Sequence, residues 1–229
     1  MGKSEIKVLG IMCSPRKGGN TQVMLEEVIR GAAEEGAGTD FFHVVGKDIK
    51  PCDHCQACVQ TAECSIKDDM QGLYKMMLEA NAIVIGTPVY FFNVTAQAKI
   101  IMDRTYNFVL HGKLANKCAG AVMPGTVMGY SSAWNALINY FFLQRMNIVD
   151  VAAGFAKEKG DIRKDRHAML SAKELGRLMV SVCKNQGVFS EEHTVPLFRY
   201  VDDKYGIERC PVGSSLHRRK RFESAYAEE

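Results

Sequence analysis

The chain has 229 residues, of which 47% are hydrophobic and 24% are charged. This length suits one sizeable core, the composition is ordinary for a globular protein, and no apolar run approaches the length that spans a membrane. The net charge of +3 is too small and too interspersed to indicate nucleic-acid binding. Because the N-terminus lacks the apolar core of a signal peptide, we expect a cytoplasmic protein that binds neither nucleic acid nor membranes. We expect one main domain, residues 1–187, and a C-terminal extension, residues 188–229.

The first predicted strand, residues 6–12, runs into a loop suited to bind a phosphate group. Gly18 and Gly19 let a ligand approach the backbone, Arg16 supplies positive charge, and the following helix adds the dipole of its N-terminus. The loop matches neither the P-loop pattern nor the dinucleotide fingerprint. Taken alone, it would equally suit a plain glycine-rich turn before a capped helix. The candidate phosphate-binding residues are Ser14, Arg16, Lys17, Gly18, Gly19, Asn20 and Thr21.

Four closely spaced cysteines follow the second predicted strand, residues 39–45. Cys52, Cys55, Cys58 and Cys64 have the spacing C-x2-C-x2-C-x5-C. Three thiolates from one tight loop, with a fourth that closes the site, can hold a [4Fe-4S] cluster. The alternatives are a four-cysteine zinc site, a disulfide pair or vestigial thiols; zinc usually takes two separated cysteine pairs, and a reducing compartment disfavours disulfides. We therefore favour a cluster held by a loop at residues 50–66.

The rest of the chain alternates between strands and helices. Further strands are predicted at residues 82–87, 117–123 and 148–153, and helices at about 94–108, 131–145 and 165–185, with another helix beginning after Asp68-Asp69. Such alternation implies right-handed crossovers and a parallel sheet covered on both faces. We expect a flavodoxin-like three-layer α/β sandwich, with five strands in the order 2-1-3-4-5.

In this strand order, the loops after strands one and three flank the switch point, where proteins of this fold bind flavin mononucleotide (FMN). The phosphate would lie in the loop 14–21 and the ring system against residues 88–93, while the glycine-rich loop 125–130 closes one side. The additional candidate FMN contacts are Pro88, Val89, Tyr90, Phe91, Asn93, Gly125, Thr126, Gly129 and Tyr130.

Together these motifs resemble the iron-sulfur flavoproteins within the flavodoxin-like NADPH-dependent FMN reductases. The resemblance covers residues 5–186. It rests on Ser14-Pro15-Arg16 with Gly19-Asn20-Thr21, on the cysteine motif leading to Asp68-Asp69-Met70, and on Thr87-Pro88-Val89-Tyr90-Phe91 followed by Lys99 and Asp103-Arg104. It implies FMN, a [4Fe-4S] cluster with the four cysteines as ligands, and a dimer or tetramer in which the cluster faces the flavin of a neighbouring subunit.

We therefore expect an electron-transfer flavoenzyme. A flavin accepts one or two electrons and a cluster passes one at a time, so together they can link NAD(P)H or a one-electron carrier such as ferredoxin to a small-molecule acceptor. The sequence shows no hydrolytic triad, and the catalytic chemistry is expected of the flavin rather than of a named side chain. The alternatives are an NAD(P)H-dependent flavin, quinone or nitro reductase without a functional cluster, and a noncatalytic flavin carrier or sensor.

Assembly is expected as well. The cysteine loop follows strand two, an edge strand, so a second copy packed there would cover both the sheet edge and the cluster. We expect a homodimer or homotetramer. Residues 194–229 are expected to pack on a neighbouring subunit or to be partly disordered.

Overall fold

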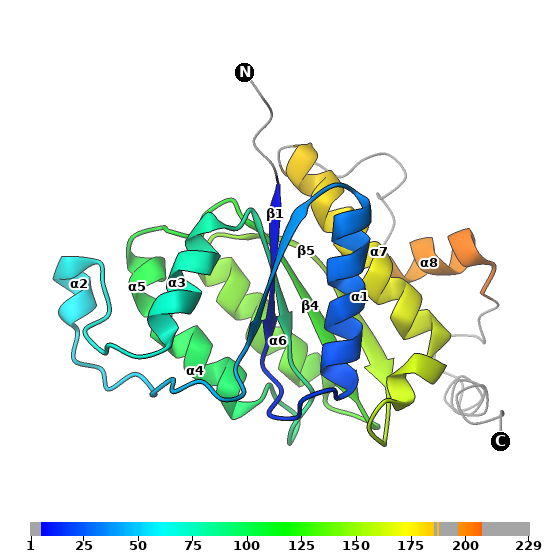
Figure 1. Cartoon of the computed structure of the whole chain (residues 1–229), viewed down its shortest axis with the longest axis horizontal. Coiled ribbons are helices and arrows are strands. Elements are labelled where there is room, and N and C mark those ends of the chain that lie inside the picture. The colour runs from blue at the N-terminus through cyan, green and yellow to red at the C-terminus, as the bar shows by residue number, and fades with distance from the viewer. Residues whose placement is uncertain (1–5, 186, 188–196, 208–229) are drawn as a thin grey trace.

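Five parallel strands form one sheet in the order β2-β1-β3-β4-β5, with helices on both of its faces (Figure 1). The strands are β1 (Lys7–Met12), β2 (Gly38–His43), β3 (Ala82–Gly86), β4 (Cys118–Gly125) and β5 (Asn147–Phe155). The computed structural model describes residues 6–185, 187 and 197–207. The expected flavodoxin-like sandwich and its strand order are confirmed.

Burial on both faces explains why the central strands are continuous apolar runs in the sequence. All of β3 is buried, and β1 is buried from Val8 onward, because both strands lie in the middle of the sheet with helices on each face. Residues 39–41 of β2 are exposed, since this strand forms one edge of the sheet. An edge strand offers a row of backbone groups to a partner.

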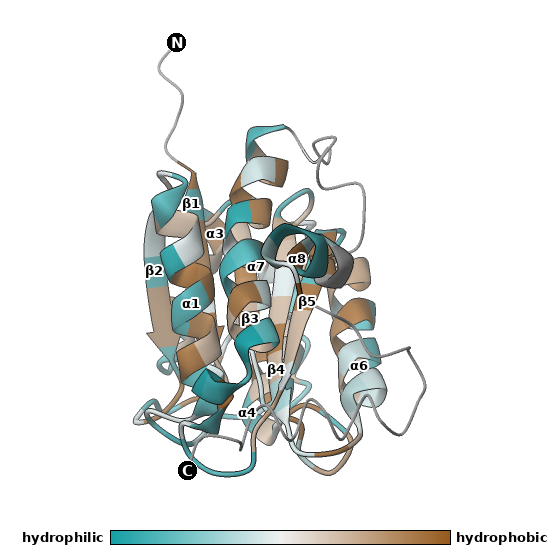
Figure 2. Ribbon diagram, turned by 90° about the vertical axis from the view of Figure 1, so that its right-hand side faces the viewer, coloured by the Kyte–Doolittle hydropathy of each residue, from teal (hydrophilic) through white to brown (hydrophobic). Residues whose placement is uncertain are grey.

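The helices divide between the two faces of the sheet. One face packs against α1 (Asn20–Glu34), α7 (Arg166–Lys184) and α8 (Leu197–Tyr205), the side turned to the viewer in Figure 2. The other face carries α3 (Met70–Glu79), α4 (Ala96–Arg104), α5 (Tyr106–Leu110) and α6 (Tyr130–Leu143), while η1 (Asp161–Lys164) precedes α7. The short helix α2 (Ala57–Thr61) lies outside both layers, at one end of the long axis in Figure 1. None of the described helices is long and apolar enough to cross a membrane.

Helices α1 and α7 touch backbone to backbone at two glycines. A Cβ atom on Gly31 would lie 2.0 Å from the carbonyl oxygen of Lys173, and one on Gly176 would lie 2.0 Å from that of Val28. No larger residue fits at either position without moving a helix, because close-packed interiors leave no room to relax.

The single helix expected over residues 94–108 is wrong, since it breaks at Thr105 into α4 and α5. The Thr105 hydroxyl lies 2.8 Å from the carbonyl oxygen of Met102, a bond to the preceding turn that bends helices. From α6, the Tyr140 hydroxyl lies 3.0 Å from the Thr105 hydroxyl, and Gln144 donates to the Thr105 carbonyl at 3.2 Å. The break turns α5 toward the cysteine loop.

The described part of the C-terminal extension packs on its own chain. The buried carboxylate of Glu174 on α7 accepts hydrogen bonds from the Tyr205 hydroxyl at 2.5 Å and from Lys204 Nζ at 3.0 Å. Arg177 donates to the same carboxylate at 2.8 Å. Helix α8 thus packs on α7, where the sequence indicated packing on a neighbour or disorder. Residues 194–196 and 208–229 of that expectation lie outside the described residues.

Candidate functional site

The loops after β1, β3, β4 and β5 leave the sheet at the same edge, the lower edge in Figure 1. Hydrogen bonds join them to one another. Val89 N donates to the carbonyl of Pro124 at 3.1 Å, and Ala156 N donates to that of Gly125 at 2.9 Å. The buried Thr95 hydroxyl donates to the carbonyl of Cys13 at 2.7 Å. The three loops that the sequence assigned to FMN are therefore brought together at the switch point between β1 and β3.

The loop after β1 has the features of a phosphate site. The Ser14 hydroxyl accepts a hydrogen bond from Arg16 N at 3.2 Å, which curls the loop, and the Arg16 side chain is exposed. Gly18 has a φ of +64°, a conformation that glycine adopts without strain. Gly19 precedes α1 and has no side chain to cap it, so the N–H groups of the first turn stay available to an anion. These residues fit the phosphate of FMN.

Asn20 and Thr21 serve this loop in a different way. The Asn20 side chain donates to the carbonyl of Glu158 at 2.8 Å and accepts from Gly160 N at 2.8 Å, so it fixes the loop after β5. Thr21 is buried, and its methyl group packs against Gly86. The Asn20 contacts bring Lys159 to the phosphate loop, where a Cβ on Gly18 would lie 3.5 Å from its Nζ. Sequence reasoning missed Lys159, although its place after the fifth strand could have indicated it.

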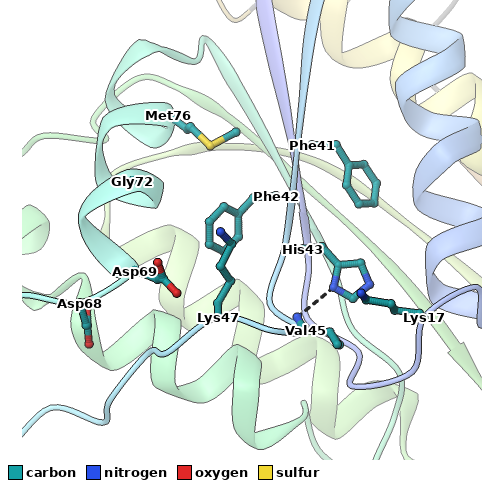
Figure 3. Close-up of a pocket in the computed structure, with 10 residues that line it drawn as sticks. All are labelled: Lys17, Phe41, Phe42, His43, Val45, Lys47, Asp68, Asp69, Gly72 and Met76. Atoms are coloured by element: carbon teal, nitrogen blue, oxygen red, sulfur yellow. Dashed lines mark hydrogen bonds between the residues drawn. The ribbon is translucent and has the colours of Figure 1, made fainter.

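Lys17 lines a separate pocket of about 550 Å³ on the edge strand β2 (Figure 3). Figure 3 shows its side chain beside His43, whose Nδ1 accepts a hydrogen bond from Val45 N at 2.9 Å. Burial and the nearby Lys17 ammonium lower the pKa of His43. Lys47 lies over the Phe42 ring on the other side of the strand, 6.0 Å from its centroid. The side chain of Lys17 thus lies at this pocket, beside the edge strand.

The loop after β3 ends in a strained aromatic turn. Tyr90 and Asn93 exchange backbone hydrogen bonds of 2.9 and 3.0 Å. Between them, Phe91 and Phe92 have φ values of 49° and 64°, which are costly for bulky side chains and are found mainly at functional sites. Phe91 is 99% exposed. Pro88 and Val89 are half-buried at the base of the turn.

The loop after β4 packs against this turn. Gly129 has a φ of +95°, and a Cβ there would lie 2.8 Å from the Cα of Phe92. A Cβ on Gly125 would lie 2.8 Å from the Tyr130 hydroxyl, so Tyr130 packs directly on this glycine. That hydroxyl donates to the carbonyl of Gly154 at 2.8 Å, so Tyr130 braces the loop against β5. Thr126 is exposed at the tip of the loop.

The four motif cysteines line a single pocket together with Arg104 and Asn107. Over residues 6–185, 187 and 197–207, no group of three or more His, Cys, Asp or Glu side chains is arranged to hold a metal ion. The thiols therefore share a pocket without converging on one point. In a [4Fe-4S] cluster each cysteine ligates a different iron atom. The donor set of four thiols in one pocket fits a [4Fe-4S] cluster.

A buried ion pair fixes both ends of the cysteine loop. Arg104 and Asp68 have 0% exposed side chains and approach to 2.6 Å. The guanidinium also donates to the carbonyls of Lys50 at 2.7 Å and Ile66 at 3.2 Å, one on each side of the cysteines. Asp68 in turn accepts from Lys50 N at 2.9 Å and from Met70 N at 3.0 Å. Although burial alone would raise the pKa of Asp68, these hydrogen bonds lower it below its ordinary value.

Further contacts hold the middle of the loop on α5 and on the turn that follows α5. His111 Nε2 lies 3.1 Å from the carbonyl oxygen of Cys58, and Lys113 Nζ donates to the carbonyl of Ala62 at 2.7 Å. The loop consequently sits against α4 and α5, outside the helical layer, with α2 at its outer end (Figure 1).

Comparison with known proteins identifies the family. The profile of the NADPH-dependent FMN reductases matches residues 6–160. An iron-sulfur flavoprotein of Methanocaldococcus jannaschii is 35% identical over 189 residues, which cover 78% of this chain and 98% of that protein. The chain belongs to the iron-sulfur flavoproteins of this reductase family. It is thus a flavin-dependent oxidoreductase, and membership of the family supports FMN as its cofactor.

A second relative supports the same family, and solved structures support the same fold. An iron-sulfur flavoprotein of Archaeoglobus fulgidus is 38% identical over 154 residues, 64% of this chain and 76% of that protein. RosB, solved with a bound riboflavin-phosphate intermediate, superposes with a TM-score of 0.60 at 18% identity, over 95% of this chain and 86% of that one. The Trp repressor binding protein of Bacillus subtilis gives a TM-score of 0.56 at 18% identity, over 73% and 96%. At these identities the solved structures support the fold alone.

Proposed function

We propose that this flavoprotein binds FMN and one [4Fe-4S] cluster and transfers electrons between NAD(P)H or a one-electron carrier such as ferredoxin and a small-molecule acceptor. The observation that carries the proposal is the shared pocket of Cys52, Cys55, Cys58 and Cys64, held by a buried ion pair on a flavodoxin-like frame. When bound, FMN and the cluster would supply two-electron and one-electron redox chemistry respectively.

The side chains of the protein would bind and orient the two groups. Arg16 and the N–H groups at the start of α1 would hold the phosphate, with Lys159 adding positive charge beside Gly18. The turn at residues 88–93 and the loop at 125–129 would bound the ring system. The four cysteines would bind iron as thiolates.

Anaerobic purification followed by metal and flavin analysis tests this proposal. We expect FMN, iron and acid-labile sulfide in the purified protein, with a broad visible shoulder beneath the flavin bands. The variant Cys55→Ala/Cys58→Ala should lose iron and the shoulder but keep FMN, while Cys183→Ala, outside the motif, should keep both. Flavin without iron would favour a reductase without a functional cluster, zinc in place of iron would overturn the cluster, and flavin without turnover would indicate a carrier or sensor.

We further propose a homodimer or homotetramer in which electrons pass between subunits. Two exposed surfaces support this proposal, because a second copy would cover them. One is the set of exposed apolar side chains in the loops after β3 and β4, at the sheet edge that carries the candidate FMN loops (the FMN edge), and the other is the edge strand β2. The exposed loop residues are Tyr90, Phe91, Phe92, Val127 and Met128.

A mixed oligomer tests this transfer. One chain would carry Cys55→Ala and Cys58→Ala, and the other Arg16→Ala with an added block in the phosphate loop. We expect the mixture to regain cluster-dependent flavin reduction by a one-electron donor, which neither parent shows. An assembled mixture that holds both cofactors yet stays inactive would assign transfer to one chain.

A further inference from the structure

One hydrogen-bond donor of Arg104 has no acceptor among the residues that the structure describes. A guanidinium carries five N–H groups. The two terminal nitrogens donate to both oxygens of Asp68 at 2.6 and 3.1 Å and to the carbonyls of Lys50 and Ile66 at 2.7 and 3.2 Å. The fifth donor, Nε–H, is buried and has no acceptor among the described residues.

Such a donor requires an explanation, because a buried polar group without a partner loses its hydration and regains nothing. The arginine is held rigidly, so Nε cannot turn toward water without breaking four other hydrogen bonds. The guanidinium lines the pocket of the four cysteines. The acceptors that line this pocket include the four thiol sulfurs and the buried Oδ1 of Asn107, which also has no partner among the described residues.

Cys64 is the thiol with which Arg104 interacts. Cys64 and Arg104 line the same pocket, and the guanidinium donates to the carbonyl of Ile66, two residues along the chain from Cys64. The side chain of Tyr74 lies on the same side, since its hydroxyl donates to the Arg104 carbonyl at 2.5 Å. Arg104 is therefore fixed between the carboxylate of Asp68 and the sulfur end of the pocket.

We infer that the Nε–H of Arg104 donates a hydrogen bond to cluster sulfur at the Cys64 position and thereby raises the reduction potential of the cluster. The inference rests on the proposed function, since it needs the cluster. Hydrogen bonds to the sulfurs stabilise the more negative, reduced state. Because Asp68 already compensates the charge of the guanidinium, the effect comes from this local donor rather than from net charge. Arg104 is a positioning residue with a second task, to tune the potential.

The test compares reduction potentials in holoproteins. Arg104→Lys keeps the charge next to Asp68 but removes Nε–H, and Arg30→Lys, exposed on α1, is the matched control. We expect Arg104→Lys to favour the oxidised cluster by about tenfold, a shift of about 59 mV to more negative potential for a one-electron couple, and Arg30→Lys to leave the potential unchanged. An unchanged potential in a fully loaded Arg104→Lys protein would overturn the inference.

A second measurement needs no variant and decides the matter if Arg104→Lys loses its cluster. Wild-type protein labelled with ¹⁵N-arginine should show a ¹⁵N hyperfine coupling to the reduced cluster in pulsed EPR, because a hydrogen bond transfers spin density to the donor. An iron-loaded protein without that coupling would overturn the role of Arg104 alone. Wild-type protein purified without oxygen and lacking iron and sulfide would overturn the proposed function itself.

Discussion

Replacing Asp68 with asparagine should destabilise the protein severely. The substitution keeps the shape of the side chain but removes the charge that faces the guanidinium of Arg104, and both side chains are 0% exposed. An uncompensated buried charge typically costs about 3–5 kcal/mol. Since a domain is stable by only about 5–15 kcal/mol, this loss would be a large fraction of the total.

The assay is urea-induced unfolding followed by far-UV circular dichroism, on proteins with matched cofactor content. Asp103→Asn is the control, because Asp103 lies on the helix that carries Arg104 and forms an exposed ion pair with Lys99 at 2.6 Å. Exposed pairs contribute only about 0.2–1 kcal/mol. Equal losses in the two variants would show that the buried pair does not hold the loop as described.

The pH dependence gives an independent check of the same pair. The pKa of Asp68 lies below its ordinary value of 3.8 in the folded protein. A carboxyl with a depressed folded pKa stabilises the fold above its unfolded pKa, and this stabilisation is lost as the pH falls through the folded pKa. The advantage of wild type over Asp68→Asn should be full at neutral pH and should shrink in acid below about pH 4. If the difference in stability between wild type and Asp68→Asn stays constant down to acid pH, the lowered pKa of Asp68 is contradicted.

Three further predictions address the FMN edge and the helix contact. Arg16→Ala should weaken FMN binding by about ten- to a hundredfold, which is the contribution of one charge-assisted hydrogen bond. A fluorescence titration measures this affinity, and the control Arg30→Ala should leave it unchanged. If Arg16→Ala binds FMN as tightly as wild type, the loop is misassigned. Tyr90→Ala should change the flavin spectrum or affinity more than the melting temperature, and the opposite pattern would assign Tyr90 to packing. Gly176→Ala should lower the free energy of unfolding by about 1–3 kcal/mol, because the added methyl group would overpack against α1. Gly72→Ala is the control and should cost nothing, since no atom lies within 4 Å of the added Cβ. If urea unfolding gives the two variants the same stability, the close contact at Gly176 is refuted.

The sheet could be predicted because its central strands are continuous apolar runs in the sequence. Residues 82–86 are apolar without interruption and are all buried in β3, so the pattern and the structure report the same environment. The order of the strands followed from the regular alternation with helices, and it placed the three candidate FMN loops at one edge. The spacing of Cys52, Cys55, Cys58 and Cys64 similarly pointed to a shared pocket from local sequence alone.

What could not be predicted depends on partners far along the chain. The break at Thr105 involves Tyr140 and Gln144, which are 35 and 39 residues away. Asp68 and Arg104 were both part of the resemblance, but their pairing across 36 residues has no sequence signature. Helix α8 escaped notice because its docking depends on a buried carboxylate, Glu174, inside an otherwise ordinary amphipathic helix.

The way the cysteine loop is anchored has a consequence for oxidative damage. Arg104 and Lys113 fix the loop to the protein through hydrogen bonds in which no metal takes part. Small zinc domains, by contrast, unfold when their metal leaves. If the proposed cluster were lost to oxygen, the thiols would stay close to their places, and the sheet edge with the candidate FMN loops would remain folded. Reloading with iron and sulfide would then be a local repair rather than a new folding event.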